Sequence, residues 1–177
     1  MRRLVASQLG ASLFDDRLCD LCVGWLLDDV SAIREAATRN LRVLAEQFGT
    51  EWAWRVAMPR VLLMRTQRSY LRRITAMRCI CSLAETVDAS DVAQVVAPAL
   101  EMCDDRVPNV RFNAALCLEQ LAKTVHAAHL VRPTDAAIKS ALDSIAPRLL
   151  RLADGDQDTD VRDFATKSHA NLAALLA

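Results

Sequence analysis

The sequence predicts an all-α fold built from stacked helix pairs, and three observations support this. An arginine is followed three residues later by alanine and ten residues later by leucine at four places: Arg34/Ala37/Leu44, Arg73/Ala76/Leu83, Arg111/Ala114/Leu121 and Arg162/Ala165/Leu172. The arginines follow one another at steps of 39, 38 and 51 residues, near the period of about 40 of helix-pair solenoids. Composition is 53% hydrophobic but only 5% aromatic, with 4 glycines and 5 prolines, which favours helices over strands.

The repeat divides the chain into about four and a half helix pairs within a single domain over 1–177. Each full pair has an outer helix, a short turn and an inner helix that carries the arginine. The expected divisions are a half repeat at 1–12, full repeats at 13–49, 50–88, 89–126 and 134–177, and a longer connection at 127–133.

In the first full pair we expect helices at 14–27 and 31–48. Ile33, Ala37, Leu41 and Leu44 recur at helical spacing and are predicted to share the buried face. Gly49 is a natural residue to end the inner helix.

The next two pairs follow the same plan, with helices expected at 51–65 and 70–87, then at 90–103 and 108–125. Pro108 suits the first turn of a helix, where its missing N–H has no partner to lose. Ser90, followed by Asp91, is a candidate N-cap.

The last pair is expected at 134–152 and 159–177, joined by a polar turn over 154–158. The long step before it is explained by the connection at 127–133, where Arg132-Pro133 disfavours a continuous helix. Because the chain begins in mid-repeat, we expect it to be part of a longer solenoid.

Charge and composition argue against several classes of partner. The chain has 22 lysines and arginines and 22 aspartates and glutamates, so its formal net charge is zero. Net charge therefore does not favour binding of the whole chain to nucleic acid or to an anionic membrane. The apolar stretch after Met1 is too short for a signal peptide, and no run approaches a membrane span. We therefore expect a cytoplasmic protein, with the nucleus as a second compartment. The cysteines lie among apolar neighbours and are predicted to be reduced: Cys19, Cys22, Cys79, Cys81, Cys103 and Cys117.

An aspartate stands six residues before three of the four arginines, and Gln67 takes that place before the fourth. Such an aspartate lies close enough to its arginine for charge-assisted hydrogen bonds, so repetition predicts a structural ladder between adjacent repeats. The ladder residues are Asp28, Arg34, Asp105, Arg111, Asp156 and Arg162. A basic ligand-binding strip along the inner helices is the alternative.

The spacing Asp-x5-Arg-x2-Ala on the inner helix is the pattern of HEAT repeats. Several stretches, in order, also resemble the C-terminal repeats of the scaffold (A) subunit of the type-2A protein serine/threonine phosphatase. They include Ala32–Ala37, Phe48-Gly49, Glu51-Trp52-Ala53, Tyr70-Leu71, Asn109–Asn113, Asp156-Gln157-Asp158 and Phe164-Ala165. The similarity extends over almost the whole chain and covers the family's last four and a half repeats.

The resemblance implies a non-catalytic scaffold in which the turns within the repeats hold the phosphatase catalytic subunit. A B-type regulatory subunit is implied as a partner only of the full-length scaffold, whose N-terminal repeats carry most of that contact. Carried over by position, the docking residues are Val30, Ser31, Ser69, Tyr70, Arg73, Val107, Pro108, Asn109 and Asp158. Ser31 departs from the family, which commonly has a bulky aromatic there, and the turn at 66–69 lacks the family's Asp-Pro.

Other functions stay open. A HEAT-repeat adaptor for another protein cargo, such as a transport factor, would bind through its inner helices. An enzyme ranks third, because the sequence has no Gly-rich phosphate loop and no recognisable catalytic constellation. We expect no cofactor and no metal: Cys19 and Cys22 lie far along the chain from His126 and His129, and the stretch from Asp154 lacks the glycine and glutamate of a calcium loop.

Overall fold

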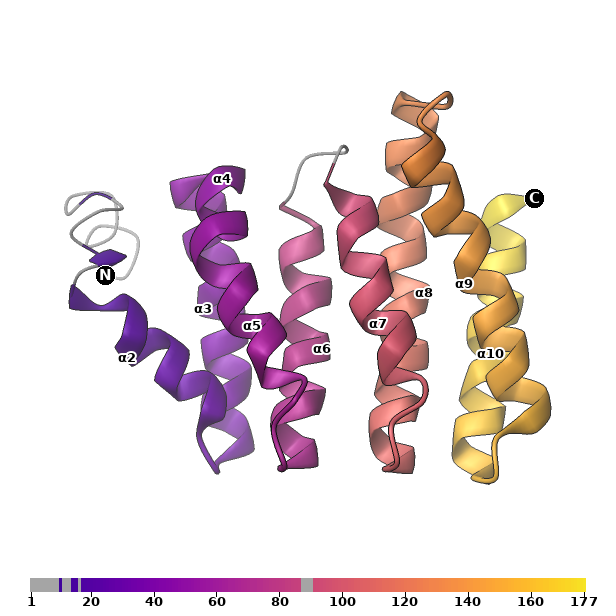
Figure 1. Cartoon of the computed structure of the whole chain (residues 1–177), viewed down its shortest axis with the longest axis horizontal. Helices are drawn as coiled ribbons and strands as arrows, with labels where there is room; N and C mark the ends of the chain where they lie inside the picture. The colour runs from indigo at the N-terminus through magenta and orange to yellow at the C-terminus, as the bar shows by residue number, and fades with distance from the viewer. Residues whose placement is uncertain (1–9, 11–13, 16, 87–90) are drawn as a thin grey trace. The chain divides into compact units, whose positions relative to one another are not determined.

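The computed structural model describes residues 10, 14, 15, 17–86 and 91–177, and every regular element in this part of the chain is helical (Figure 1). Most of the half repeat expected at 1–12, and the N-cap expected at Ser90, lie outside the described residues. The fold divides into two compact units, Met1–Val87 and Asp88–Ala177. That the chain is a single domain, divided into the repeats given above, stays a prediction.

In the first unit the elements are α2 (Cys19–Gly24), the 3-10 helix η1 (Trp25–Leu27), α3 (Ser31–Phe48), α4 (Thr50–Trp52), the π-helical segment η2 (Ala53–Ala57), α5 (Met58–Met64) and α6 (Tyr70–Ala84). The inner helices α3 and α6 pack on each other, and α5 packs on α6. The α3 bounds predicted from the sequence are confirmed at both ends. Gly49 closes α3 with φ of +92°, in the left-handed region that favours glycine.

The outer helix expected at 51–65 is interrupted, which the sequence pattern did not predict. Residues Ala53–Ala57 form a π-helical turn directly before α5, in which Pro59 occupies the first turn. A proline inside a helix has no N–H to donate and its ring crowds the carbonyl four residues earlier, so the regular ladder is displaced there.

In the second unit the elements are the 3-10 helix η3 (Val92–Val95), α7 (Val96–Met102), α8 (Pro108–Val131), α9 (Ala136–Gly155) and α10 (Thr159–Leu176). Helix α10 packs against both α8 and α9, and α7 packs against α8. Pro108 begins α8, as predicted.

The connection predicted at 127–133 is wrong over 127–131, because α8 continues through these residues to Val131. The helix ends at Arg132, whose φ of −129° and ψ of 68° lie outside the helical region. The pyrrolidine ring of Pro133 disfavours a helical conformation at the residue before it. The inserted residues therefore lengthen an inner helix, and the connection proper is only 132–135.

The alanine and leucine of the repeated motif are buried in every repeat. Exposure is 5% and 9% for Ala37 and Leu44, 0% for Ala76, Leu83, Ala114, Leu121 and Ala165, and 1% for Leu172. Alanine removes side-chain volume where two helices approach, and leucine fills the space one to two turns further on. Within the described residues, no helix has both the length and the apolar content needed to cross a membrane.

The cysteines only partly follow the prediction. Cys19, Cys22, Cys79 and Cys103 are free thiols, which is confirmed for these four. Burial raises the pKa of Cys79 to about 12 and that of Cys103 to about 11, so both stay protonated at neutral pH. Cys81 and Cys117 are not free thiols, so the prediction is wrong for these two.

Candidate functional site: the turns within the helix pairs

The arginine of the motif ties together the turn that precedes it, in the same way in all four repeats. Its Nη1 donates to the backbone carbonyl of the residue six positions earlier. The pairs are Arg34 to Asp28 (2.8 Å), Arg73 to Gln67 (2.8 Å), Arg111 to Asp105 (2.8 Å) and Arg162 to Asp156 (2.7 Å). In the first, second and fourth turns the same nitrogen also reaches the next carbonyl, at 2.9, 3.0 and 3.2 Å.

Within one repeat of the described chain, therefore, the arginine does not pair with the aspartate carboxylate as the sequence had led us to expect. It binds the main-chain carbonyl, which glutamine supplies as well as aspartate does, so Gln67 occupies the position without loss of the bond.

The aspartate side chains have a different task inside their own turns. Each accepts a hydrogen bond from the backbone N–H two residues later: Asp28 from Val30 (2.7 Å), Asp105 from Val107 (2.8 Å) and Asp156 from Asp158 (2.9 Å). This is the Asx-turn arrangement, which stabilises a tight turn without a second residue's side chain. Arginine and aspartate together hold these turns in one conformation.

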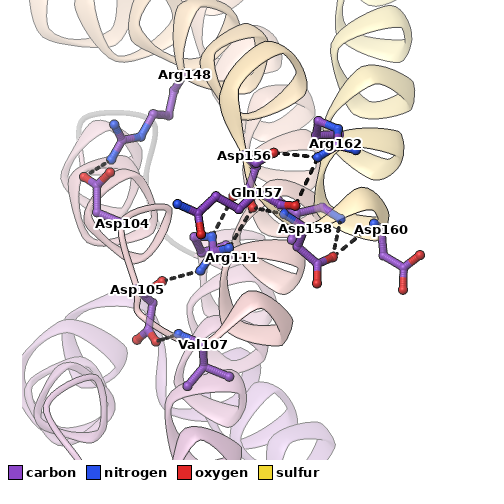
Figure 2. A network of polar contacts seen from close by, with 11 residues as sticks. Asp104, Asp105, Val107, Arg111, Arg148, Asp156, Gln157, Asp158, Asp160 and Arg162 are labelled. Atoms are coloured by element: carbon purple, nitrogen blue, oxygen red, sulfur yellow. Dashed lines mark hydrogen bonds and ion pairs between the residues drawn. The ribbon is translucent and has the colours of Figure 1, made fainter.

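An ion pair between Arg111 and Asp156 joins adjacent repeats in the second unit (Figure 2). Arg111 Nε donates to Asp156 Oδ2 and Nη2 to Oδ1, both at 2.6 Å. The side chains are only 15% and 3% exposed. The Arg111 guanidinium lowers the pKa of the Asp156 carboxyl, chiefly through these hydrogen bonds. Arg111 thus links its own turn to the next one.

A second link in this unit is made by Arg148 of α9. Its Nη2 donates to the carbonyl of Leu100 at 2.9 Å, near the C-terminal end of α7, and also binds the Asp104 carboxylate (Figure 2). The Leu100 carbonyl also accepts from the Cys103 N–H at 3.2 Å, so the guanidinium adds a second donor at the C-terminal end of α7. Asp158 completes the next turn by accepting from the N–H groups of Asp160 and Val161 at 3.0 and 3.2 Å, which caps α10.

The structure places most of the predicted docking residues at the surface of these turns. Val30 is 55% exposed and Tyr70 is 40% exposed. Ser31, Pro108 and Asn109 are exposed, whereas Ser69, Val107 and Asp158 are half-buried. Arg73 is only 5% exposed and holds its turn, so it shapes the surface and presents no free guanidinium there.

Sequence reasoning missed two apolar residues that lie beside this surface. Ile33 is 40% exposed and Leu71 is 38% exposed, each in the first turn of an inner helix. Helical spacing had placed Ile33 on the buried face. Arg34, at 7% exposure, takes that face, because its head must turn inward to reach the carbonyls of Asp28 and Asp29.

Replacement of Arg34 by methionine is expected to lower the free energy of unfolding by about 1–3 kcal/mol, because it leaves carbonyls of a tight turn without charged donors. Arg39→Met is the matched control in the same helix. The Arg39 side chain is 71% exposed, and its nearest ionic contact, to Glu35, is 3.9 Å long. This control is expected to change stability by less than about 0.5 kcal/mol. Urea unfolding followed by circular dichroism measures both; equal effects would contradict the stabilising role of Arg34 in its turn.

Among the described residues, no group of three histidine, cysteine, aspartate or glutamate side chains is arranged to hold a metal ion. The turns of the first unit present apolar side chains, and those of the second unit carry arginines and aspartates. Such turns offer a surface for contact with another molecule.

The sequence of these helix pairs is similar to that of known proteins. Residues 95–125 match the HEAT repeat family, a segment that runs from the end of η3 through the turn at Asp105 into α8. Over 139 residues the chain is 36% identical to the regulatory (A) subunit of protein phosphatase PP2A from Saccharomyces cerevisiae, a match that covers 75% of this chain and 20% of that protein. The chain contains a HEAT repeat and resembles the PP2A regulatory (A) subunit. The resemblance and the all-α HEAT-repeat fold inferred from the sequence are thereby confirmed.

A second relative has the same description. The PP2A regulatory (A) subunit of Schizosaccharomyces pombe is 38% identical over 65 residues, which are 36% of this chain and 11% of that protein. The chain therefore spans about a fifth of the length of the first relative, and the matched part of the second is shorter still. The structure is also similar to the crystal structure of an engineered protein, with 15% sequence identity and a TM-score of 0.41. The alignment covers 96% of this chain and 85% of the engineered chain. A TM-score of that size is too low to bear on function.

Proposed function

We propose that this chain acts as a non-catalytic scaffold segment, and that its turns hold the catalytic subunit of a type-2A protein phosphatase. The observation that carries the proposal is the recurrence of one turn geometry. In each HEAT repeat an arginine binds the carbonyl six residues back. The names of the two relatives, each a regulatory subunit of a phosphatase, supply the class of partner.

Turns held in this way suit a binding surface for a physical reason. A loop that is already ordered loses little conformational entropy when a partner docks on it. Val30 and Tyr70 lie on such turns with about half of their surface open, and a tyrosine ring buries a large area at low entropy cost. A scaffold of this kind would act by positioning the enzyme and raising its effective concentration near its substrates, with no chemistry of its own.

Tyr70→Ala is expected to weaken catalytic-subunit binding by about 10- to 50-fold, the range of a lost aromatic anchor. Leu63→Ala is the control, because Leu63 is 67% exposed but belongs to the outer helix α5. Affinity is measured by biolayer interferometry with purified catalytic subunit, and each variant is first checked for an unchanged melting curve.

A second pair of variants tests the corresponding turn in the other unit. Val107→Asp places a charge at the turn before α8, whereas Val131→Asp places the same charge at the far end of that helix, where Val131 is 76% exposed. We expect only the first to weaken binding. Failure of the intact chain to bind the catalytic subunit would overturn the proposal, and so would equal effects of the turn and control variants.

An adaptor for another protein cargo is the second candidate, and an aromatic pair on the inner helices favours it. Phe112 of α8 and Phe164 of α10 stack edge to face with ring centroids 4.0 Å apart, both half-buried, and Lys167 Nζ lies 5.3 Å from the centre of the Phe164 ring. In that case Phe164→Ala would weaken cargo binding and the turn variants would not.

A further inference from the structure

A polar hollow of about 400 Å³ lies in the second unit between two consecutive turns, the one before α8 and the one before α10. Its wall includes Cys103, Asp105, Arg111, Arg148, Arg151 and Asp156. A second hollow of about 450 Å³ shares Asp104, Arg148 and Arg151 with the first. Two arginines of α9 therefore line both hollows.

Each of the three acids of this hollow has at least one carboxylate oxygen engaged. Both carboxylate oxygens of Asp156 accept from Arg111, and Oδ1 also accepts from the N–H of Asp158. The Asp104 carboxylate binds Arg148, and Asp105 Oδ1 accepts from the N–H of Val107 (Figure 2). A cationic ligand at Asp156 would have to displace the Arg111 guanidinium.

Donors, by contrast, are left over. Arg148 Nε is buried and has no hydrogen-bond acceptor among the described residues. Arg151 is exposed and makes no hydrogen bond or ion pair with any residue that the structure describes. The two residues are three positions apart on α9, so their side chains leave the same face of the helix. The unsatisfied groups at the hollow are therefore positively charged N–H donors, which would bind a negatively charged hydrogen-bond acceptor.

The formal charge of the side chains around the hollow also limits how much negative charge a ligand can carry. Arg111, Arg148 and Arg151 are opposed by Asp104, Asp105 and Asp156 around the hollow, so its formal charge is close to zero. A single carboxylate can bind the free guanidinium in a bidentate manner, whereas a phosphate dianion would meet the surrounding carboxylates with twice the charge. A carboxylate is the ligand class that fits.

We propose that this hollow receives an aspartate or glutamate side chain of the docked protein, held by Arg151 with Arg148 beside it. This inference rests on the function proposed above, since the occupant is a residue of the phosphatase catalytic subunit. The hollow is lined by Asp105 of one docking turn and Gln157 of the next, so a partner seated on both turns would lie beside it. A carboxylate carried by a bound partner also avoids the entropy cost that a free anion meets on association.

The test compares two charge reversals in the intact chain. Arg151→Glu is expected to weaken catalytic-subunit binding by at least about 10-fold, and the loss should shrink as salt is raised. Arg132→Glu makes the same change of net charge beyond the end of α8, at another exposed position, and should change affinity less than about 2-fold. Arg151→Gln, which adds no negative charge, should lie between the two. Circular dichroism melts check that all three variants fold as the wild type does.

A reverse substitution then identifies the occupant. Catalytic subunits with single Asp or Glu to Arg changes are screened against Arg151→Glu, and one of them is expected to restore binding. If the wild-type chain binds but Arg151→Glu and Arg132→Glu behave alike, this inference is overturned and the proposed function stands. If the wild-type chain does not bind, both are overturned. Saturable binding of inorganic phosphate to the chain alone, abolished by Arg151→Glu, would also overturn the assignment to a protein carboxylate.

Discussion

Asp156→Asn is expected to lower the free energy of unfolding of the second unit by about 2–4 kcal/mol. This is slightly less than the loss of about 3–5 kcal/mol when one partner of a fully buried ion pair is removed, because the Arg111 side chain is 15% exposed. The Asp156 side chain is 3% exposed and receives two hydrogen bonds of 2.6 Å from Arg111. The amide cannot balance the guanidinium charge and replaces one acceptor oxygen with a donor group, so Arg111 is left buried with an unpaired charge.

Asp154→Asn is the matched control for this substitution. Asp154 lies two residues earlier, is exposed, and makes no hydrogen bond or ion pair within the described part of the chain. We expect its replacement to change stability by less than about 0.5 kcal/mol. Urea unfolding followed by circular dichroism gives both values. A loss for Asp156→Asn no larger than that of the control would contradict the role assigned to the ion pair.

The same ion pair predicts a dependence on pH. The pKa of Asp156 is lowered from its ordinary value of 3.8 in the folded state. The stabilisation is therefore present above that ordinary value and is lost as the pH falls through the lower, folded-state pKa. Wild type and Asp156→Asn should differ fully at pH 7 and converge in strongly acidic solution. A difference that does not shrink on acidification would show that the carboxylate charge is not its source.

Leu121→Ala is expected to lower the free energy of unfolding by about 3–5 kcal/mol, a larger loss than that from breaking the ion pair. Leu121 is the leucine of the third repeat motif and is 0% exposed. Its truncation removes apolar contacts and leaves a cavity in a unit where α8 is packed against α9 and α10. The close packing of such an interior lets the neighbours fill little of that space.

Leu130→Ala makes the same chemical change nine residues further along α8, where the side chain is 69% exposed. Its expected effect is within about 0.5 kcal/mol of wild type. Thermal and urea unfolding of the two variants, side by side, separates burial from helix propensity, since both gain alanine in one helix. Similar losses in both would show that the repeat motif does not mark the core.

Most of the helices could be predicted from the sequence because their signals are local. The bounds of α3 follow from helical spacing and from Gly49, and α8 begins where Pro108 lacks an N–H to satisfy. The outer helix of the second repeat differs because Pro59 displaces the hydrogen-bond ladder into a π-helical turn, a matter of backbone geometry that apolar spacing does not encode.

The location of the candidate site was likewise predictable, but its contacts were not. The motif marks where each turn ends, so Val30, Tyr70 and Val107 were correctly placed at turns. Which atom of the turn the arginine binds depends on the direction of backbone carbonyls, and these are set only when the chain is folded. The burial of Arg73 and the exposure of Ile33 follow from that geometry.

By itself, the sequence determined the helical fold, the HEAT repeat and its family resemblance, because all three are written in spacings of a few residues repeated along the chain. Only the tertiary structure decided which distant side chains meet. Arg111 and Asp156 are 45 residues apart, and Arg148 and Asp104 are 44 apart. The hollow between the two turns forms only when adjacent repeats stack. The Arg151 guanidinium, which has no partner among the described residues, then lies at its wall.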